Sequence, residues 1–196
     1  MTRVSEALLG QRERGGDTLS RHMAPVLILP GYGGSGPEHW QTRWEALHPE
    51  YRRVEVPDWN QPDLDVWVKA LGDAAAPLGE PPVIVAHSLG CLVVAHFAGR
   101  GGSVRAALLV AVPDPSGPEF PPEARGFADL PLVPLGFRSR VVASRNDPYG
   151  SFELSARCAR AWGSELSDVG ALGHINADSG LGDWPEGERL LSDLLG

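Results

Sequence analysis

The chain has 196 residues, which suits one domain with a sizeable hydrophobic core. Hydrophobic residues make up 42% of the sequence and charged residues 21%, the balance of a globular, soluble protein. The net charge of −8 disfavours binding to nucleic acid or to an anionic membrane surface.

The start of the chain carries no signal of folded structure. Residues 1–22 hold many charges and no apolar stretch of the signal-peptide type, so we expect a disordered segment there and a single domain over residues 23–196. No apolar run is long enough to span a bilayer. The two cysteines, Cys91 and Cys158, lack metal-site spacing and cannot form a disulfide framework. The simplest expectation is a cytoplasmic protein without a bound metal.

Short β-rich runs alternate with helical stretches along the rest of the chain, which is typical of a mostly parallel sheet covered on both faces. The expected strands occupy residues 25–29, 52–56, 82–86, 105–111, 140–144 and 165–169. The expected helices occupy residues 39–47, 63–75, 90–98, 152–162 and 186–195. We therefore expect an α/β fold with a compact, doubly wound sheet of six parallel strands in the order 2-1-3-4-5-6.

A glycine-rich loop, residues 30–36, follows the first expected strand. It lacks the Lys-Ser/Thr ending of a phosphate-binding P-loop, which disfavours nucleotide binding. Its glycines permit a tight turn and the close approach of a substrate. This loop is therefore a candidate source of backbone N–H groups for a reaction site.

The third expected strand leads into the most informative segment of the chain. Ser88 stands between the small residues Ala86 and Gly90, and a helical run follows at once. This is the pattern of a nucleophile elbow, a sharp strand-to-helix turn that lifts a serine hydroxyl out of the sheet. Alanine is a mild departure from the usual glycine at the first small position. We expect Ser88 to be a nucleophile, and the alternative is an ordinary turn serine.

A nucleophilic serine needs a histidine base and an acid that orients the base. In open-sheet hydrolases these residues follow in the chain order Ser, Asp or Glu, His. Of the six histidines, His174 alone follows the last expected strand, so we expect it to be the base. Asp147 follows the fifth strand and is the expected acid. Asp114, after the fourth strand, is the alternative, although an aspartate among prolines often serves only as a turn former.

The negative charge that develops on an attacked carbonyl needs two backbone N–H donors, the oxyanion hole. One should be the amide of Leu89, the residue after the nucleophile. The other should come from the glycine-rich loop, where the Tyr32 amide is the first candidate and the Gly33 amide the next. The sequence therefore predicts that two segments far apart in the chain converge on one carbonyl oxygen.

Two further features bear on the substrate pocket. Residues 112–134 hold seven prolines and two glycines, which predicts an irregular segment and at most a small lid between the fourth and fifth strands. Trp40, Trp59 and Trp184 are candidates for pocket walls, although aromatic residues at such positions belong more often to the core. The tryptophans therefore support no assignment.

Taken together, the motifs resemble a known family. They are Pro-Gly-Tyr-Gly-Gly at 30–34, Pro-Asp-Trp at 57–59, Ala-His-Ser-Leu-Gly-Cys at 86–91, Asn-Asp-Pro at 146–148 and Gly-His-Ile-Asn at 173–176. This set is similar to the small serine hydrolases of the YdeN and retinoblastoma-binding-protein-9 type, from about residue 25 to the C-terminus. The resemblance implies a compact α/β-hydrolase with the triad Ser88, Asp147 and His174, no cofactor and little or no lid. The retinoblastoma-pocket motif Leu-x-Cys-x-Glu is not present, because Val93 stands where glutamate is required.

The expected function is hydrolysis of a small-molecule ester through an acyl-enzyme on Ser88, without cofactor or metal. Thioester or amide cleavage would use the same groups. The alternative from another class is a non-catalytic binding protein on the same scaffold, because a fold alone does not prove activity. The sequence makes no prediction of the oligomeric state.

Overall fold

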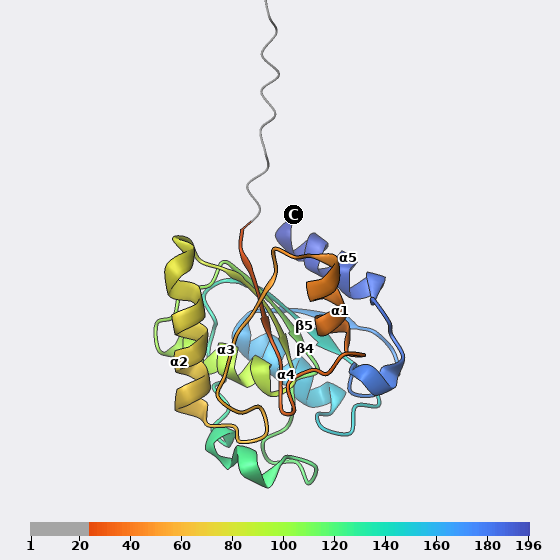
Figure 1. Ribbon diagram of the computed structural model, residues 1–196. Helices are drawn as coiled ribbons and strands as arrows, with labels where there is room; N and C mark the ends of the chain where they lie inside the picture. The colour runs from red at the N-terminus through yellow and green to blue at the C-terminus, as the bar shows by residue number, and fades with distance from the viewer. Residues whose placement is uncertain (1–23) are drawn as a thin grey trace, which may run out of the picture.

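The computed structural model describes residues 24–196, which form a parallel sheet between two layers of helices (Figure 1). The disordered segment expected over residues 1–22 lies outside the described residues. The strands are β1 (Val26–Leu29), β2 (Arg52–Arg53), β3 (Val83–His87), β4 (Ala106–Val110), β5 (Arg138–Ala143) and β6 (Glu165–Asp168). They lie in the order β2-β1-β3-β4-β5-β6 and every neighbouring pair is parallel, which confirms the predicted fold class.

Strand β2 is shorter than the predicted residues 52–56, because it lies at the edge of the sheet and pairs with β1 alone. One further backbone bond, from the Val54 amide to the Ile28 carbonyl at 2.9 Å, continues the contact with β1. Proline at position 57 then ends the extended run, since it has no N–H to donate. The other predicted strands differ from the observed ones by only one or two residues at an end.

The helices agree with the predicted ranges to within one residue at each end. They are α1 (Trp40–Leu47), α2 (Leu64–Ala75), α3 (Leu89–Gly99), α4 (Phe152–Trp162) and α5 (Pro185–Leu195). Short 3₁₀ turns occupy Ala76–Leu78, Pro122–Phe127 and Ala177–Ser179. Side chains cap three of the α-helices: His39 accepts an amide at the start of α1, Asp63 at the start of α2 and Ser151 at the start of α4.

Each face of the sheet has its own hydrophobic core. Helices α2, α3 and α4 cover one face, where Trp67, Leu92 and Trp162 are buried. Helices α1 and α5 cover the other face with Trp44 and Leu191 (Figure 1). The central strands β1, β3 and β4 are therefore buried on both sides, which explains why their sequences read as continuous apolar runs.

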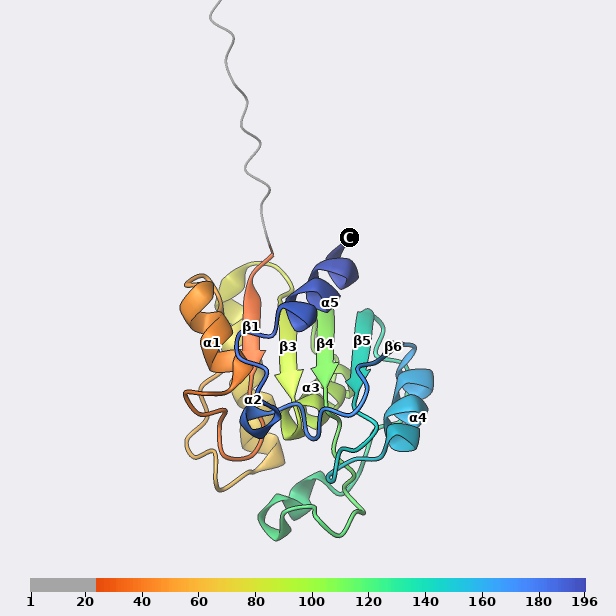
Figure 2. The ribbon, with the colours of Figure 1, turned by 90° about the vertical axis from the view of Figure 1, so that its right-hand side faces the viewer.

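All strands point the same way, so their carboxyl ends meet along one edge of the sheet, at the bottom of Figure 2. The proline-rich segment between β4 and β5 lies below this edge and forms only the 3₁₀ turn Pro122–Phe127. An open α/β sheet builds its binding site at the carboxyl ends of its strands. The site is therefore expected in the loops that follow β1, β3, β5 and β6.

Among residues 24–196, no helix is both long enough and apolar enough to cross a membrane. The cytoplasmic location stays a prediction from the sequence.

Candidate active site

Ser88 occupies a strained turn between β3 and α3. Its backbone has φ 53° and ψ −124°, a region that residues with a side chain rarely adopt. Its small neighbours fit the crowding there, because a Cβ on Gly90 would lie 2.6 Å from the Leu29 carbonyl oxygen. A Cβ on Gly31 would likewise lie 2.8 Å from the Ser88 Cβ. The close approach of the β1 loop, β3 and α3 therefore requires glycine at both positions.

The three residues predicted to act together form one hydrogen-bonded chain. The Nε2 atom of His174 lies 2.9 Å from Ser88 Oγ, and its Nδ1 atom lies 2.9 Å from both carboxylate oxygens of Asp147. The side chains of His174 and Asp147 are 10% and 2% exposed. Because a carboxylate only accepts, Nδ1 carries the imidazole proton and Nε2 presents a lone pair to the serine hydroxyl. This arrangement allows His174 to take a proton from Ser88.

Asp147 rather than Asp114 meets the histidine. Asp147 also accepts the backbone amide of Tyr149 at 2.9 Å, which fixes the carboxylate from its own turn. The Tyr149 ring lies beside the His174 ring, with centroids 4.5 Å apart. Asp114 instead accepts the amide of Ser116 at 2.8 Å and closes a local turn. The geometry thus favours the first of the two predicted acids.

The two predicted oxyanion donors, the Tyr32 and Leu89 amides, belong to segments that line the same pocket as Ser88. Leu89 begins α3, so its amide belongs to the unpaired N–H groups at a helix start. The β1 loop is packed against it, because a Cβ on Gly31 would lie 3.1 Å from the Leu89 nitrogen. Among residues 24–196, neither the Tyr32 amide nor the Leu89 amide donates a backbone–backbone hydrogen bond outside the helices and strands. Gly33, the second candidate in the loop, donates its amide to the Trp59 carbonyl at 3.1 Å and is already engaged.

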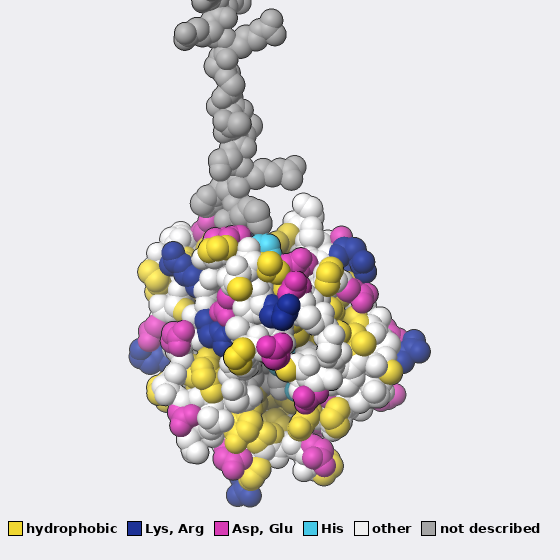
Figure 3. Space-filling model, turned by 45° about the vertical axis from the view of Figure 1, so that its right-hand side comes forward, with side chains coloured by type: hydrophobic (Ala, Val, Ile, Leu, Met, Phe, Trp, Pro, Cys, Tyr) yellow, Lys and Arg dark blue, Asp and Glu magenta, His cyan; other side chains and the backbone are white. Residues whose placement is uncertain are grey.

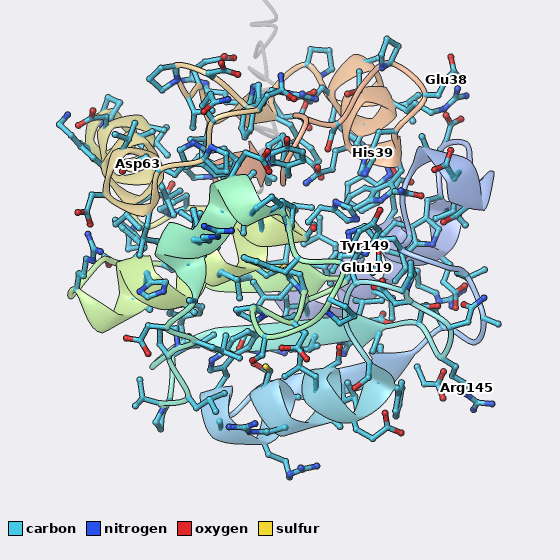
Figure 4. The ribbon with its side chains drawn as sticks, turned by 90° about the horizontal axis from the view of Figure 1, so that it is seen from below. Glu38, His39, Asp63, Glu119, Arg145 and Tyr149 are labelled. Atoms are coloured by element: carbon cyan, nitrogen blue, oxygen red, sulfur yellow. The ribbon has the colours of Figure 1, made fainter. Side chains whose placement is uncertain are left out.

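A pocket of about 450 Å³ opens above Ser88 and His174. Hydrophobic side chains gather around a hollow on this face of the molecule (Figure 3). The side-chain walls come from four loops and include Tyr32, His39, Glu119, Phe120, Pro121, Tyr149 and Asn176. Figure 4 shows Glu119 beside Tyr149 at the carboxyl edge, with His39 on the α1 side. The volume suits a small-molecule ligand.

Two buried histidines, His39 and His87, lie beside the site, and the pKa of each is lowered. Burial, followed by electrostatic interactions with Arg53 and His174, lowers the pKa of His39 to about 3. Burial, followed by the nearby His39 and His174, holds the pKa of His87 well below its usual value. Their rings are 4.6 Å apart at 70°, and the His87 ring lies 4.9 Å from that of His174. Within residues 24–196, no group of His, Cys, Asp and Glu side chains has the arrangement of a metal site.

Several residues of the site have no counterpart among the predicted site residues. Glu119, Phe120 and Pro121 come from the proline-rich segment, where the sequence indicated a loop but not its path. Tyr149 lies in the same turn as Asp147, a proximity that the sequence does offer as a signal. The three candidate tryptophans do not line the pocket: Trp40 and Trp184 are core residues between α1 and α5, and Trp59 packs on Trp67.

The chain is similar to known hydrolases over most of its length. A family model described as serine hydrolase matches residues 26–193. YdeN of Bacillus subtilis strain 168, a protein assigned as a hydrolase, is 27% identical over 173 residues, which cover 82% of this chain and 90% of YdeN. The crystal structure of YdeN has a TM-score of 0.70 at 24% identity and covers 88% of this chain and 99% of its own. The crystal structure of a YdeN-like hydrolase from Pectobacterium atrosepticum SCRI1043 has a TM-score of 0.78 at 35% identity. The match covers 86% of this chain and 89% of that hydrolase. These likenesses confirm the predicted resemblance to the YdeN type.

Proposed function

Because the chain belongs to the serine hydrolase family, we propose that it is an esterase that cleaves a small ester through an acyl-enzyme on Ser88. The observation that carries this proposal is the chain of hydrogen bonds from Ser88 through His174 to Asp147, with each contact at 2.9 Å. Additional support comes from the pocket of about 450 Å³, which opens directly onto the Ser88 side chain.

In the proposed first half-reaction, Ser88 Oγ attacks the ester carbonyl carbon while His174 Nε2 takes the hydroxyl proton. The Asp147 carboxylate stabilises the imidazolium that forms. The Tyr32 and Leu89 amides donate to the carbonyl oxygen as it becomes an oxyanion. The intermediate collapses when the bond to the leaving alkoxide breaks, and His174 returns the proton to that alkoxide. The acyl group is then bound to Ser88.

The proposed second half-reaction repeats these steps with water. His174 Nε2 removes a proton from water, whose oxygen attacks the acyl carbonyl carbon. The bond from that carbon to Ser88 Oγ then breaks, and the proton passes from His174 to Ser88. The carboxylic acid leaves and the starting state is restored. We choose an ester over an amide because an alkoxide is a better leaving group than an amide anion. It therefore depends less on protonation by His174 as it leaves.

A matched series of substrates tests the proposal. The p-nitrophenyl esters of acetate and butyrate, the butyryl thioester of the same aryl group and the corresponding anilide are compared for wild type and for Ser88→Ala. We expect ester turnover to exceed anilide turnover and to fall by at least about 10³-fold in Ser88→Ala. Equal ester turnover by the two proteins would overturn the proposal, and a faster thioester or anilide would move it to that bond.

A fluorophosphonate probe separates this proposal from a non-catalytic binding protein. The probe forms a covalent bond to an activated serine. We expect it to label wild type and not Ser88→Ala, when circular dichroism shows both proteins folded. Failure to label folded wild type, together with no ester turnover, would favour the binding protein.

A further inference from the structure

The loop that carries His174 lies outside the strands of the sheet. It follows β6, an edge strand whose residues are mostly exposed. His174 is flanked by two residues in the left-handed region, Gly173 with φ 60° and Ile175 with φ 48°. A β-branched residue such as Ile175 is strained there, so the surroundings must hold it in place. The position of the imidazole therefore depends on contacts that this loop makes with other elements.

Side chains from three other parts of the chain bind the backbone of this loop. Four consecutive residues of the loop each form one such hydrogen bond. The Leu172 amide donates to Ser144 Oγ at 2.9 Å, and the Gly173 amide donates to Asn146 Oδ1 at 2.8 Å. The His174 carbonyl is bonded to His87 Nε2 at 2.9 Å, and the Ile175 carbonyl accepts from Trp40 Nε1 at 2.8 Å. The residues before Ser88 and before Asp147 are thus both bonded to the loop that carries His174.

Two of these hydrogen bonds come from residues next to the reacting groups, His87 and Asn146. The bond from His87 is the more buried of the two. His87 is 5% exposed, whereas Asn146 is exposed to solvent. A carbonyl oxygen can only accept, so His87 Nε2 carries the proton and donates it. Within residues 24–196, no other group donates to the His174 carbonyl. This single bond therefore connects the end of β3, directly before Ser88, to the backbone of His174.

His87 is suited to donate this bond rather than to carry protons. His39 packs edge-on against it at 4.6 Å and uses its own Nδ1 to accept the Gln41 amide at 3.1 Å. The Trp40 ring lies 6.1 Å from the His87 ring, which adds a further wall. The imidazole is thus enclosed by rings on the α1 side and faces His174 on the other. Enclosure by packing limits the number of orientations that the donor can adopt.

We propose that His87 is a positioning residue that fixes the backbone of His174 and so keeps its imidazole in line with Ser88 Oγ. The proposal rests on the proposed function, because it treats Ser88 and His174 as the reacting groups. A displacement of about 1 Å in a reacting group costs on the order of 100-fold in rate. Loss of the His87 donor should therefore lower kcat far more than it changes KM, because the Nε2 donor of His87, which also lines the pocket, is bonded to the His174 carbonyl.

Three substitutions test the role of the donated hydrogen bond. In His87→Gln the side-chain amide nitrogen can reach the place of Nε2, whereas in His87→Asn it reaches only the place of Nδ1. His87→Phe fills the ring volume without a donor. We expect His87→Gln to keep kcat within about threefold, and His87→Asn and His87→Phe to lose about 10- to 100-fold with KM changed less than twofold. His96→Gln, a histidine of α3 outside the pocket, serves as the control and should keep kcat.

Thermal unfolding of each variant separates a positioning role from a purely structural one. The proposal is overturned if His87→Gln loses as much kcat as His87→Asn and His87→Phe, or if all three keep it. It is equally overturned if His87→Gln folds and the other two do not, because the bond would then serve the fold. The fluorophosphonate labelling rate should fall with kcat. Absence of labelling in wild type would instead contradict the proposed function itself.

Discussion

Ser88 and Ile175 both hold their backbones at positive φ, 53° and 48°, on the two sides of the bond between Ser88 and His174. Such conformations cost on the order of 1–3 kcal/mol each and persist only where packing and hydrogen bonds enforce them. At Ser88 the enforcement comes from the Val110 carbonyl, which accepts the Ser88 amide at 2.9 Å. At Ile175 it comes from Trp40, whose indole N–H binds the Ile175 carbonyl. Two of the five non-glycine residues with positive φ among residues 24–196 are thus the proposed nucleophile and the residue that follows the proposed base.

The carboxylate of Asp147 should matter for turnover far more than for binding. Asp147→Asn keeps the side-chain shape but removes the charge that stabilises the imidazolium and offers His174 Nδ1 a donor or a weaker acceptor. We expect kcat for the butyrate ester to fall by about 10⁴-fold with little change in KM. Steady-state kinetics on purified protein measures both constants.

Asp114→Asn is the matched control for this prediction. The asparagine oxygen can still accept the Ser116 amide, so the turn and kcat should both persist. If Asp114→Asn loses turnover and Asp147→Asn keeps it, the acid has been assigned to the wrong strand end.

Sequence reasoning was able to predict that Ser88, Asp147 and His174 lie close together, because parallel strands bring their following loops to one edge. It was not able to predict the contacts made by Ser144, Asn146 and His87, whose roles depend on side-chain direction within a turn. His87 in particular stands beside Ser88 in sequence, yet its ring is directed to the backbone of the His174 loop. Sequence spacing predicts which loops lie close together, whereas the packing of the side chains determines which atoms are in contact.

At the scale of elements, the β1 loop and the start of α3 must touch for the two proposed oxyanion donors to converge. Gly31→Ala places a Cβ 2.8 Å from the Ser88 Cβ and 3.0 Å from the His87 carbonyl oxygen, so the loop has to move away. We expect kcat to fall by about 100-fold, because the Tyr32 amide moves with the loop.

Gly99→Ala, at the end of α3, has no atom within 4 Å of the added Cβ and should leave kcat unchanged. Equal kcat values for Gly31→Ala and Gly99→Ala would show that the β1 loop does not contribute to the reaction.

Helix α1 begins with a buried histidine, which makes the stability of the fold sensitive to acid. The folded pKa of His39 is about 3, below the unfolded value of 6.5, because burial disfavours the charged ring. As pH falls below 6.5, the unfolded chain binds a proton that the folded chain cannot, so the free energy of unfolding falls down to about pH 3. Between pH 7 and pH 5 this one group accounts for a loss of about 2 kcal/mol.

His39→Asn tests this dependence, because asparagine is also a good helix cap and does not titrate. Urea unfolding at pH 7 and pH 5 should show that the variant loses about 2 kcal/mol less than wild type. Parallel losses in the two proteins would mean that His39 is protonated in the folded state.

Elements were predictable where the sequence pattern reports burial directly. The apolar runs of β3 and β4 and the strand-to-helix transition at Ser88 identified the centre of the sheet. Strand β2 was predicted too long, because an edge strand with Arg52 and Arg53 has no such pattern to mark its end. The path of the segment between β4 and β5 was not predictable either, since proline fixes local φ values but not the direction of a long loop.

At the scale of the whole molecule, an excess of negative charge coincides with a carboxylate at the pocket. The net charge is −8, and Glu119 is the one residue among Asp, Glu, Lys and Arg in the described lining of the pocket. Esters with an anionic acyl group should therefore react more slowly than neutral esters of similar size. Comparison of kcat/KM for p-nitrophenyl hemisuccinate and p-nitrophenyl butyrate measures this preference.

Glu119→Gln should raise kcat/KM for the hemisuccinate about two- to fivefold at low salt and leave the butyrate unchanged. In 1 M salt the difference between the two proteins should largely disappear, because charges on an exposed side chain are screened. An equal change for both esters would indicate a steric effect of the substitution and contradict the electrostatic account.

In the proposed reaction, the acyl group is carried by the oxygen of Ser88. Trypsin cleavage after Lys69 and Arg100 releases a peptide over residues 70–100, in which Ser88 is the only residue with a hydroxyl group. We predict that acid quenching during turnover of p-nitrophenyl butyrate yields this peptide with one added butyryl mass, and that Ser88→Ala yields it unmodified. An unmodified wild-type peptide, together with full ester turnover by Ser88→Ala, would contradict the account.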